Sequence, residues 1–224
     1  ISKSIQMMNK NPDRIVRAAL HAGDKPGETN VMLTPKTRFP IHGQYTFDRE
    51  GIMTTGKDRN GFGVRDNNLL GYDDTLISGI SYGKNFNGIY AYHTIPVSPD
   101  GASVLYGYSY SKSTPQKDFN LYDLKSEAES TTVSVHQDLY RKDEYLGEIF
   151  VGFDAKDKVT YYQKGQGTLN KDRLRILSFG GSYVMRAAGS VTSISPELEQ
   201  GVNAFGSSKK NNPLSSRAGA TPTY

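Results

Sequence analysis

The stretch Asp66-Asn67-Asn68-Leu69-Leu70-Gly71-Tyr72-Asp73-Asp74 decides the fold of this chain of 224 residues. Asn, Asp and Gly favour turns, because they form local hydrogen bonds or accept a left-handed backbone. On either side lies a segment in which apolar side chains alternate with small or polar ones, at residues 59–65 and 75–83. That alternation has the period of a β-strand with one wet face. The stretch therefore predicts a turn between two strands.

The same strand-and-turn pattern continues along the chain. It predicts further strands at residues 41–47, 86–96, 102–111, 131–139, 144–154 and 174–184, and a long polar loop at residues 154–169. Several of these segments have the ~9–11 residues with which a tilted strand crosses a membrane. Short turns alternate with longer polar ones, as in outer-membrane barrels. The favoured fold class is mainly β, an antiparallel transmembrane β-barrel, and a soluble β-sandwich is the alternative.

The composition agrees with a barrel and excludes several other classes. The mean hydropathy is −0.58, and no run approaches the roughly 18 apolar residues of a membrane-spanning helix. The 27 Lys and Arg residues exceed the 23 Asp and Glu residues only slightly, without the basic block of a nucleic-acid footprint. The 15 Tyr residues suit a membrane interface or a Tyr-rich sheet. The absence of Cys excludes disulfides, thiolate metal sites and cysteine catalysis.

Motifs that would indicate chemistry are incomplete. Residues 51–57 fit the start of a P-loop, but Asp58 replaces the magnesium-binding Ser or Thr and no helix is expected to follow. The pairs Asp73/Asp74 and Asp154/Asp157 lie in turn contexts, which favours backbone capping over acid–base chemistry or calcium binding. The four histidines lack metal-ligand spacing: His21, His42, His93 and His136. We therefore predict no catalytic residue, no cofactor and no metal site, and expect a protein that is not an enzyme.

Several segments together resemble one family. They are residues 5–9 with Pro12, residues 19–23, residues 26–29, residues 48–51 with Thr55-Gly56, residues 66–74, and residues 90–96 ending in Ile95-Pro96. They are similar to the two-partner secretion outer-membrane transporters, the family of haemolysin secretion/activation proteins and filamentous-haemagglutinin transporters. Arg49 departs from the Asn usual in that family. The resemblance assigns the family's Asp-Asn-Leu-Leu-Gly-X-X-Asp signature to Asp66, Asn67, Leu69, Leu70, Gly71 and Asp74.

The resemblance implies an architecture. Residues 1–37 would be the C-terminal part of a small α/β POTRA domain in the periplasm. Residues 38–224 would be the N-terminal part of an outer-membrane barrel, about half of its 16 strands, so the chain is expected to be a fragment. The family's pore-loop motif, of the Val-Arg-Gly-Tyr type, does not occur in this sequence, and no residue is assigned to it.

The resemblance also implies a function and a location. The chain would belong to a transporter in the outer membrane of a Gram-negative bacterium. Its partners would be outer-membrane lipid and an unfolded exoprotein, such as a haemolysin or adhesin, but no nucleic acid. Whether it also activates a haemolysin stays open. The alternative within the superfamily is an outer-membrane assembly factor or surface antigen, and a soluble β-sandwich binding module is the alternative outside it.

Charged residues within the expected strands are the candidate lining of a water-filled lumen. They share the small and polar side of their strands, and they are Arg59, Arg65, Glu148, Asp154, Arg173 and Arg175. In a lumen they would keep water along the route of an extended polypeptide. The alternative is structural, because the same side chains could be solvated or pair across strands and steady the sheet.

Overall fold

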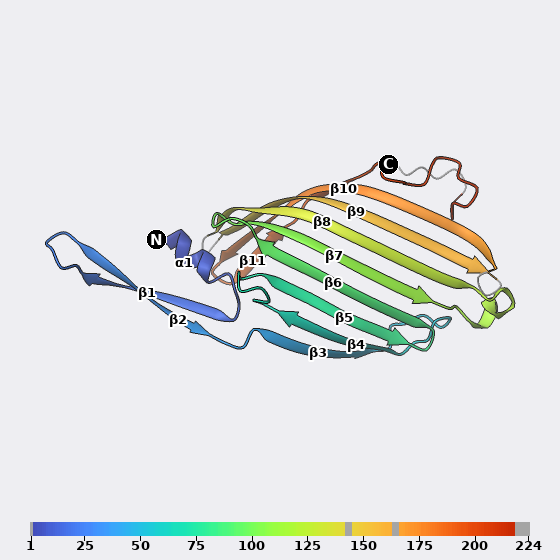
Figure 1. Cartoon of the computed structure of the whole chain (residues 1–224), viewed down its shortest axis with the longest axis horizontal. Helices are drawn as coiled ribbons and strands as arrows, with labels where there is room; N and C mark the ends of the chain where they lie inside the picture. The colour runs from blue at the N-terminus through green and yellow to red at the C-terminus, as the bar shows by residue number, and fades with distance from the viewer. Residues whose placement is uncertain (1, 142–144, 163–165, 218–224) are drawn as a thin grey trace.

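The computed structural model describes residues 2–141, 145–162 and 166–217. The chain begins with a short helix, α1 (Ser2–Met8), followed by a hairpin of β1 (Arg14–Ala22) and β2 (Thr29–Thr37). Within the described residues, these two strands pair only with each other, and they project from the main body (Figure 1). The sequence of residues 14–20 allows either a strand or a short helix. In the structure these residues form a strand, because their backbone groups are hydrogen-bonded to those of β2.

The main body is one antiparallel sheet of ten strands, of which the first nine pair in sequence order (Figure 1). A 3-10 helix, η1 (Lys117–Tyr122), lies between β7 and β8. The strands are β3 (Ile41–Asp48), β4 (Arg59–Asp66), β5 (Thr75–Gly83), β6 (Phe86–Pro96), β7 (Ala102–Ser113), β8 (Lys125–Arg141), β9 (Tyr145–Tyr162), β10 (Gly167–Ala187), β11 (Ser190–Ile194) and β12 (Glu197–Gly201).

The last two strands form a single interrupted strand along β10. Tyr183 pairs with Ile194 of β11 and Ile176 pairs with Gly201 of β12, so the same register runs through both. The interruption falls at Pro196, which has no amide hydrogen to donate, although its carbonyl still accepts a hydrogen bond from the Gly181 amide (3.1 Å). On the side away from β9, β10 therefore has this interrupted strand beside it along more than half of its length.

The structure confirms the predicted strands and corrects one predicted loop. Strands β5 and β6 have the predicted bounds, whereas β8, β9 and β10 are 17, 18 and 21 residues long and exceed the prediction. The loop expected at 154–169 is wrong: β9 continues to Tyr162 and β10 begins at Gly167. These residues lack an apolar face, but a strand outside hydrocarbon needs only its ladder of hydrogen bonds. Residue 144, the expected start of a strand, lies outside the described residues.

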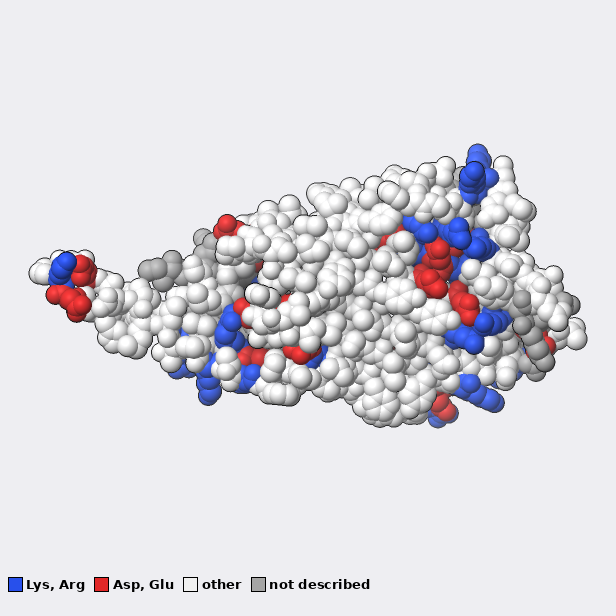
Figure 2. All heavy atoms as spheres, in the orientation of Figure 1, with Lys and Arg blue, Asp and Glu red and all other residues white. Residues whose placement is uncertain are grey.

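The sheet is curved, and its two faces differ in composition (Figure 1). On the convex side, here called the outer face, directly paired residues carry large apolar side chains that are 45–56% exposed, such as Val133, Val135 and Val151. On the concave side, the inner face, even small residues are crowded: Ser134 is 7% and Ser178 is 6% exposed. On the face seen in Figure 2, Lys, Arg, Asp and Glu gather toward the two ends of the sheet and leave a largely uncharged band between them.

This chain has almost no apolar core. Among the described residues, Val16 and Ile176 are the buried hydrophobic ones, whereas forty large hydrophobic residues are exposed. A soluble β-sandwich buries its apolar side chains between two sheets, so that alternative does not hold for the part that the structure describes. An apolar outer face is stable where lipid covers it. None of the described helices has the length and apolar character needed to cross a membrane.

Candidate functional site: inner wall and N-terminal joint

The inner face is lined mainly by small, polar and aromatic residues. In the middle of the sheet, Gly88, Tyr90 and Tyr92 of β6 follow one another on this face. On β7, Ser109 pairs with Tyr90 and Gly107 pairs with Tyr92. The ring of Tyr92 lies so close to Gly107 that a Cβ there would meet its Cδ1 at 2.0 Å. Tyr rings therefore lie along the wall because the glycines beside them leave room.

The structure separates the six charged residues that the sequence places in a lumen. Strand pairing puts Arg65 and Asp154 in one row on the inner face, and Arg59 and Glu148 on the same face. The expectation is wrong for Arg173 and Arg175, which share the outer face with Leu177 and Phe179 of the same strand.

The outer position of these two arginines has a physical reason. They lie beyond the apolar band, where a charged side chain on the outer face need not enter hydrocarbon. Arg175 instead donates to Asp157 Oδ1 (2.5 Å) and to the carbonyl of Phe205 (3.1 Å). Alternation shows which residues share a face, and the apolar residues further along the strand show which face it is.

The four inner charged residues each contact a neighbour, and Arg65 Nε donates to Asn67 Oδ1 of the turn after β4 (2.8 Å). The Arg59 guanidinium lies 3.8 Å from the centre of the Phe86 ring and donates to Thr55 Oγ1 (3.0 Å). Asp154 accepts a hydrogen bond from Thr132 on β8, and Glu148 lies 2.9 Å from His136 Nδ1. Cross-strand pairs of this kind stabilise a sheet. The residues therefore keep the wall polar and also hold its strands together.

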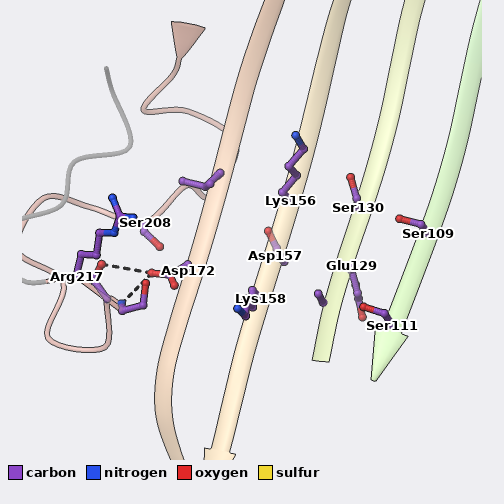
Figure 3. A pocket seen from close by; sticks show the side chains of 14 residues that line it. Ser109, Ser111, Glu129, Ser130, Lys156, Asp157, Lys158, Asp172, Ser208 and Arg217 are labelled. Carbon is purple, nitrogen blue, oxygen red and sulfur yellow. Dashed lines mark hydrogen bonds between the residues drawn. The ribbon is translucent and has the colours of Figure 1, made fainter. Parts of the chain in front are cut away.

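A pocket of about 660 Å³ lies on the inner face near the end of the sheet remote from α1. Figure 3 shows Lys156 and Lys158 of β9 beside Ser130 of β8 and Ser109 of β7. On its other side the segment 208–217 is tied to β10, since Ser215 Oγ and the Ser216 amide donate to Asp172 Oδ1 (3.3 and 3.0 Å). The pocket is a polar recess in the wall.

The signature turn, residues 66–74, connects β4 to β5, as predicted, and lies at the end of the sheet near α1 (Figure 1). Asp66 Oδ1 accepts the Asn68 amide (2.9 Å), and Asn68 Oδ1 accepts the Asp73 amide (2.9 Å). Gly71 has a φ of 84°, which side chains rarely tolerate. Leu69 and Leu70 are 48% and 53% exposed.

Asp74 anchors the signature turn in the sheet and is fully buried. One of its carboxylate oxygens accepts the Leu70 amide (2.9 Å) and the other lies 2.7 Å from His93 Nε2. His93 Nδ1 is in turn 2.8 Å from the Tyr106 hydroxyl. Burial raises the pKa of Asp74, but the hydrogen bonds from His93 and the backbone amides lower that pKa further than burial raises it. Asp74 therefore stays ionised and links the turn to β6 and β7.

The other side of the signature turn binds the N-terminal segment. Asn67, 2% exposed, donates to Asp13 Oδ2 (2.7 Å). Asn11 Nδ2 donates to the carbonyl of Asn67 (2.9 Å) and to Asp73 Oδ1 (3.1 Å), and Arg14 Nη2 pairs with Asp73 Oδ2 at 2.6 Å. We call these five residues the joint.

Two further contacts support the joint. His42 Nε2 lies 2.8 Å from Asp13 Oδ2, and Lys10 forms an ion pair of 3.1 Å with the buried Asp138 of β8. From the sequence, the side chains of the signature turn are expected to bond only to the backbone of the turn itself. The contacts with the N-terminal segment are missed, because they join residues far apart in the chain. One signal in the sequence could have indicated this contact with the turn. It is the polar stretch between the helix and the first strand, Asn11-Pro12-Asp13.

The joint should respond to acid. Hydrogen bonds from Asn67 and His42 hold the pKa of Asp13 below its ordinary value of 3.8. A carboxyl whose pKa is lowered by folding stabilises the contact above the unfolded-state pKa, and the stabilisation disappears as the pH falls through the lower, folded-state pKa. We expect the joint to be closed at pH 5–7 and to loosen below about pH 4.

Spin labels at exposed Leu20 and Leu69 would measure that opening as a broader distance distribution at low pH. In the Asp13→Asn variant the distribution should lose most of its pH dependence. A variant with the same acid response as the unmodified protein would assign the response to another group.

These features define a class of protein. A curved antiparallel sheet with an apolar outer band and a polar, pocketed inner face is the wall of a transmembrane β-barrel. The model of the haemolysin secretion/activation protein family ShlB/FhaC/HecB matches residues 27–223. The chain belongs to this family, whose members are outer-membrane barrel proteins of Gram-negative bacteria. It is a family of transporters and not an enzyme class.

A curated relative agrees with the family assignment. The chain is 24% identical over 216 residues to the outer membrane transporter CdiB of Dickeya dadantii (strain 3937). The match covers 92% of this chain and 38% of that protein. The chain thus spans well under half the length of this relative.

Solved structures share the fold. CdiB from Escherichia coli superposes with a TM-score of 0.75 at 20% identity, over 94% of this chain and 41% of that one. CdiB from Acinetobacter baumannii gives 0.72 at 12% identity, over 89% and 38%. BamA from Haemophilus ducreyi lacking POTRA domains 1–3 gives 0.50 at 11% identity, over 90% and 41%. The chain is thus more similar in fold to these two CdiB structures than to this BamA structure.

Proposed function

We propose that this chain is part of an outer-membrane transporter that secretes a large partner exoprotein, such as a haemolysin or adhesin, to the cell surface. The contrast between the two faces of the sheet carries this proposal. The apolar outer face lets the wall sit in lipid, and the inner face offers polar groups along its whole height. A polypeptide backbone cannot leave its amides unpaired in hydrocarbon, so it needs such a wet route.

The chain would then consist of two parts that meet at the end of the hairpin. Residues 1–37 would be the end of a periplasmic POTRA domain, which supports capture of the unfolded exoprotein by pairing with its extended segments. Residues 38–224 would be barrel wall, about half of a 16-stranded barrel. The isolated hairpin supports this division, because two strands alone are only marginally stable and are expected to extend a larger sheet.

The inner residues Arg59, Arg65, Glu148 and Asp154 then have a defined role. They would keep the route hydrated, and they would not form an apolar surface that binds the passing chain. The signature residues Asp66, Asn67, Leu69, Leu70, Gly71 and Asp74 would fix the turn on which the N-terminal segment rests. No step of this mechanism makes or breaks a covalent bond.

Site-specific crosslinking during secretion tests the route. A photoreactive residue at Lys156, on the inner face of β9, should capture the exoprotein while it is being exported, whereas one at Val151, on the outer face of the same strand, should capture lipid only. Deleting the transporter gene should leave the exoprotein in the periplasm. Normal secretion without the gene, or equal capture of exoprotein from both faces, would refute the proposal.

A further inference from the structure

A second pocket, of about 470 Å³, lies where the segment after β12 runs beside the start of β10. Its charged lining consists of four cations, Lys171, Arg173, Lys209 and Lys210, together with neutral residues of the segment 206–213. No carboxylate lines this pocket. We call these four residues the basic pocket. Four positive charges around one hollow favour an anionic ligand that can accept several hydrogen bonds.

The acids nearby leave the three lysines of the basic pocket available and compensate Arg173 only in part. Asp157 is the carboxylate close to Arg173, at 3.6 Å, but it is held more tightly by Arg175 at 2.5 Å. Arg173 Nε makes no hydrogen bond within the described residues. Among the residues that the structure describes, the side chains of Lys171, Lys209 and Lys210 form no ion pair. Lys209 and Lys210 are exposed. Asp157, shared with Arg175, thus compensates Arg173 only in part, and the basic pocket keeps an excess of positive charge.

Its position on the wall indicates the source of the anion. Lys171 and Arg173 alternate along β10 with the same phase as Leu177 and Phe179, so they belong to the outer face. Arg173 is four residues beyond Leu177, or roughly 13 Å along the strand, and a tilt of ~45° reduces this to about 9 Å of height. The headgroup region of one leaflet is about 5–8 Å thick. Long basic side chains reach that level easily.

We propose that the basic pocket binds the phosphate of a lipid headgroup at the rim of the barrel, and this inference rests on the outer-membrane placement in the proposed function. Lys ammonium and Arg guanidinium groups recognise phosphate oxygens through charge-assisted hydrogen bonds. The exported polypeptide is a less suitable ligand, because its route lies on the opposite face. The site fixes the height of the wall in the membrane at the edge of β10.

Native mass spectrometry of the full-length transporter in a non-ionic detergent tests this site. The probes are phosphatidic acid and diacylglycerol with the same acyl chains, which differ only in the phosphate. We expect specific binding of phosphatidic acid. The Lys171→Gln/Lys209→Gln/Lys210→Gln variant should bind it more than about tenfold more weakly, since each basic residue near an anionic surface contributes roughly fivefold.

A charge-matched control removes three exposed lysines elsewhere, as Lys25→Gln/Lys57→Gln/Lys84→Gln, and should bind within about twofold of the unmodified protein. Lys57 and Lys84 lie at the same end of the sheet as the basic pocket, so the control separates local contact from net charge. Equal weakening in both variants would overturn the proposal, as would equal binding of the two lipids. Full competition by inorganic phosphate, or tighter binding of an acidic peptide through the same lysines, would also overturn it.

Secretion assays in cells separate this inference from the proposed function. A transporter that secretes normally but shows no phosphate-dependent lipid binding contradicts the basic pocket alone. One that binds phosphatidic acid through these lysines but exports no exoprotein supports the pocket and contradicts the transport proposal.

Discussion

Replacing Asp74 with alanine should sharply reduce the amount of folded barrel. Asp74 is fully buried and accepts hydrogen bonds from the Leu70 amide and the His93 side chain. Its removal leaves both donors without their partner inside the sheet, at a cost of about 1–3 kcal/mol for each unsatisfied group. We expect a loss of about 3 kcal/mol in total. The folded fraction on unheated gels and the urea midpoint in lipid vesicles would measure the loss.

Two further variants make this result specific. Asp74→Asn keeps the shape of the side chain and one acceptor, so it should lose less stability than Asp74→Ala. Asp24→Ala removes an exposed acid from the tip of the β1–β2 hairpin and should leave folding unchanged. If Asp74→Ala folds as well as the unmodified protein, the carboxylate does not anchor the signature turn.

An arginine at Val151 should prevent stable insertion of the barrel. Val151 lies within the apolar band of the outer face and is 56% exposed. Arg at the middle of a lipid-facing band destabilises a barrel by about 2–4 kcal/mol. The expected result is loss of the folded protein from outer-membrane fractions, accompanied by degradation in the periplasm.

The matched control places the same arginine on the inner face. Ser109 is a half-buried inner-face residue on β7, in the row that joins Tyr90 to Ser130. Ser109→Arg should insert normally, because its charge faces water. If Ser109→Arg blocks insertion and Val151→Arg does not, the assignment of the two faces is reversed.

The sequence predicts most of the strands because turns and alternation are local signals. Residues 75–83 and 86–96 are bounded by Asp, Gly, Pro and Asn, and the structure has strands with these bounds. The signature turn is also found where it was expected. Polar strands are harder to recognise: between residues 154 and 169 both faces carry charges, so alternation disappears although the backbone ladder continues.

Face assignment and long-range contacts are less accessible from sequence. In β10 the pattern shows that Arg173 and Arg175 share a face, but only the continuation to Leu177 and Phe179 identifies it as the outer one. The contact of Asp13 with Asn67 joins residues 54 positions apart. Such a contact depends on how the hairpin and β4 meet, which no local pattern encodes.

With residues 1–37 in the periplasm, as proposed, the length of β10 has a consequence at the cell surface. A strand needs about 10 residues to cross the bilayer, yet β10 has 21, and ten of these, residues 167–176, precede the apolar run that starts at Leu177. At about 3.3 Å per residue they extend roughly 33 Å along the strand. With its neighbours β8 and β9, this part forms a rigid sheet that begins at the headgroup level and continues beyond the lipid. An antibody against the living cell would therefore bind a folded epitope assembled from several strands, and boiling the protein should abolish its recognition.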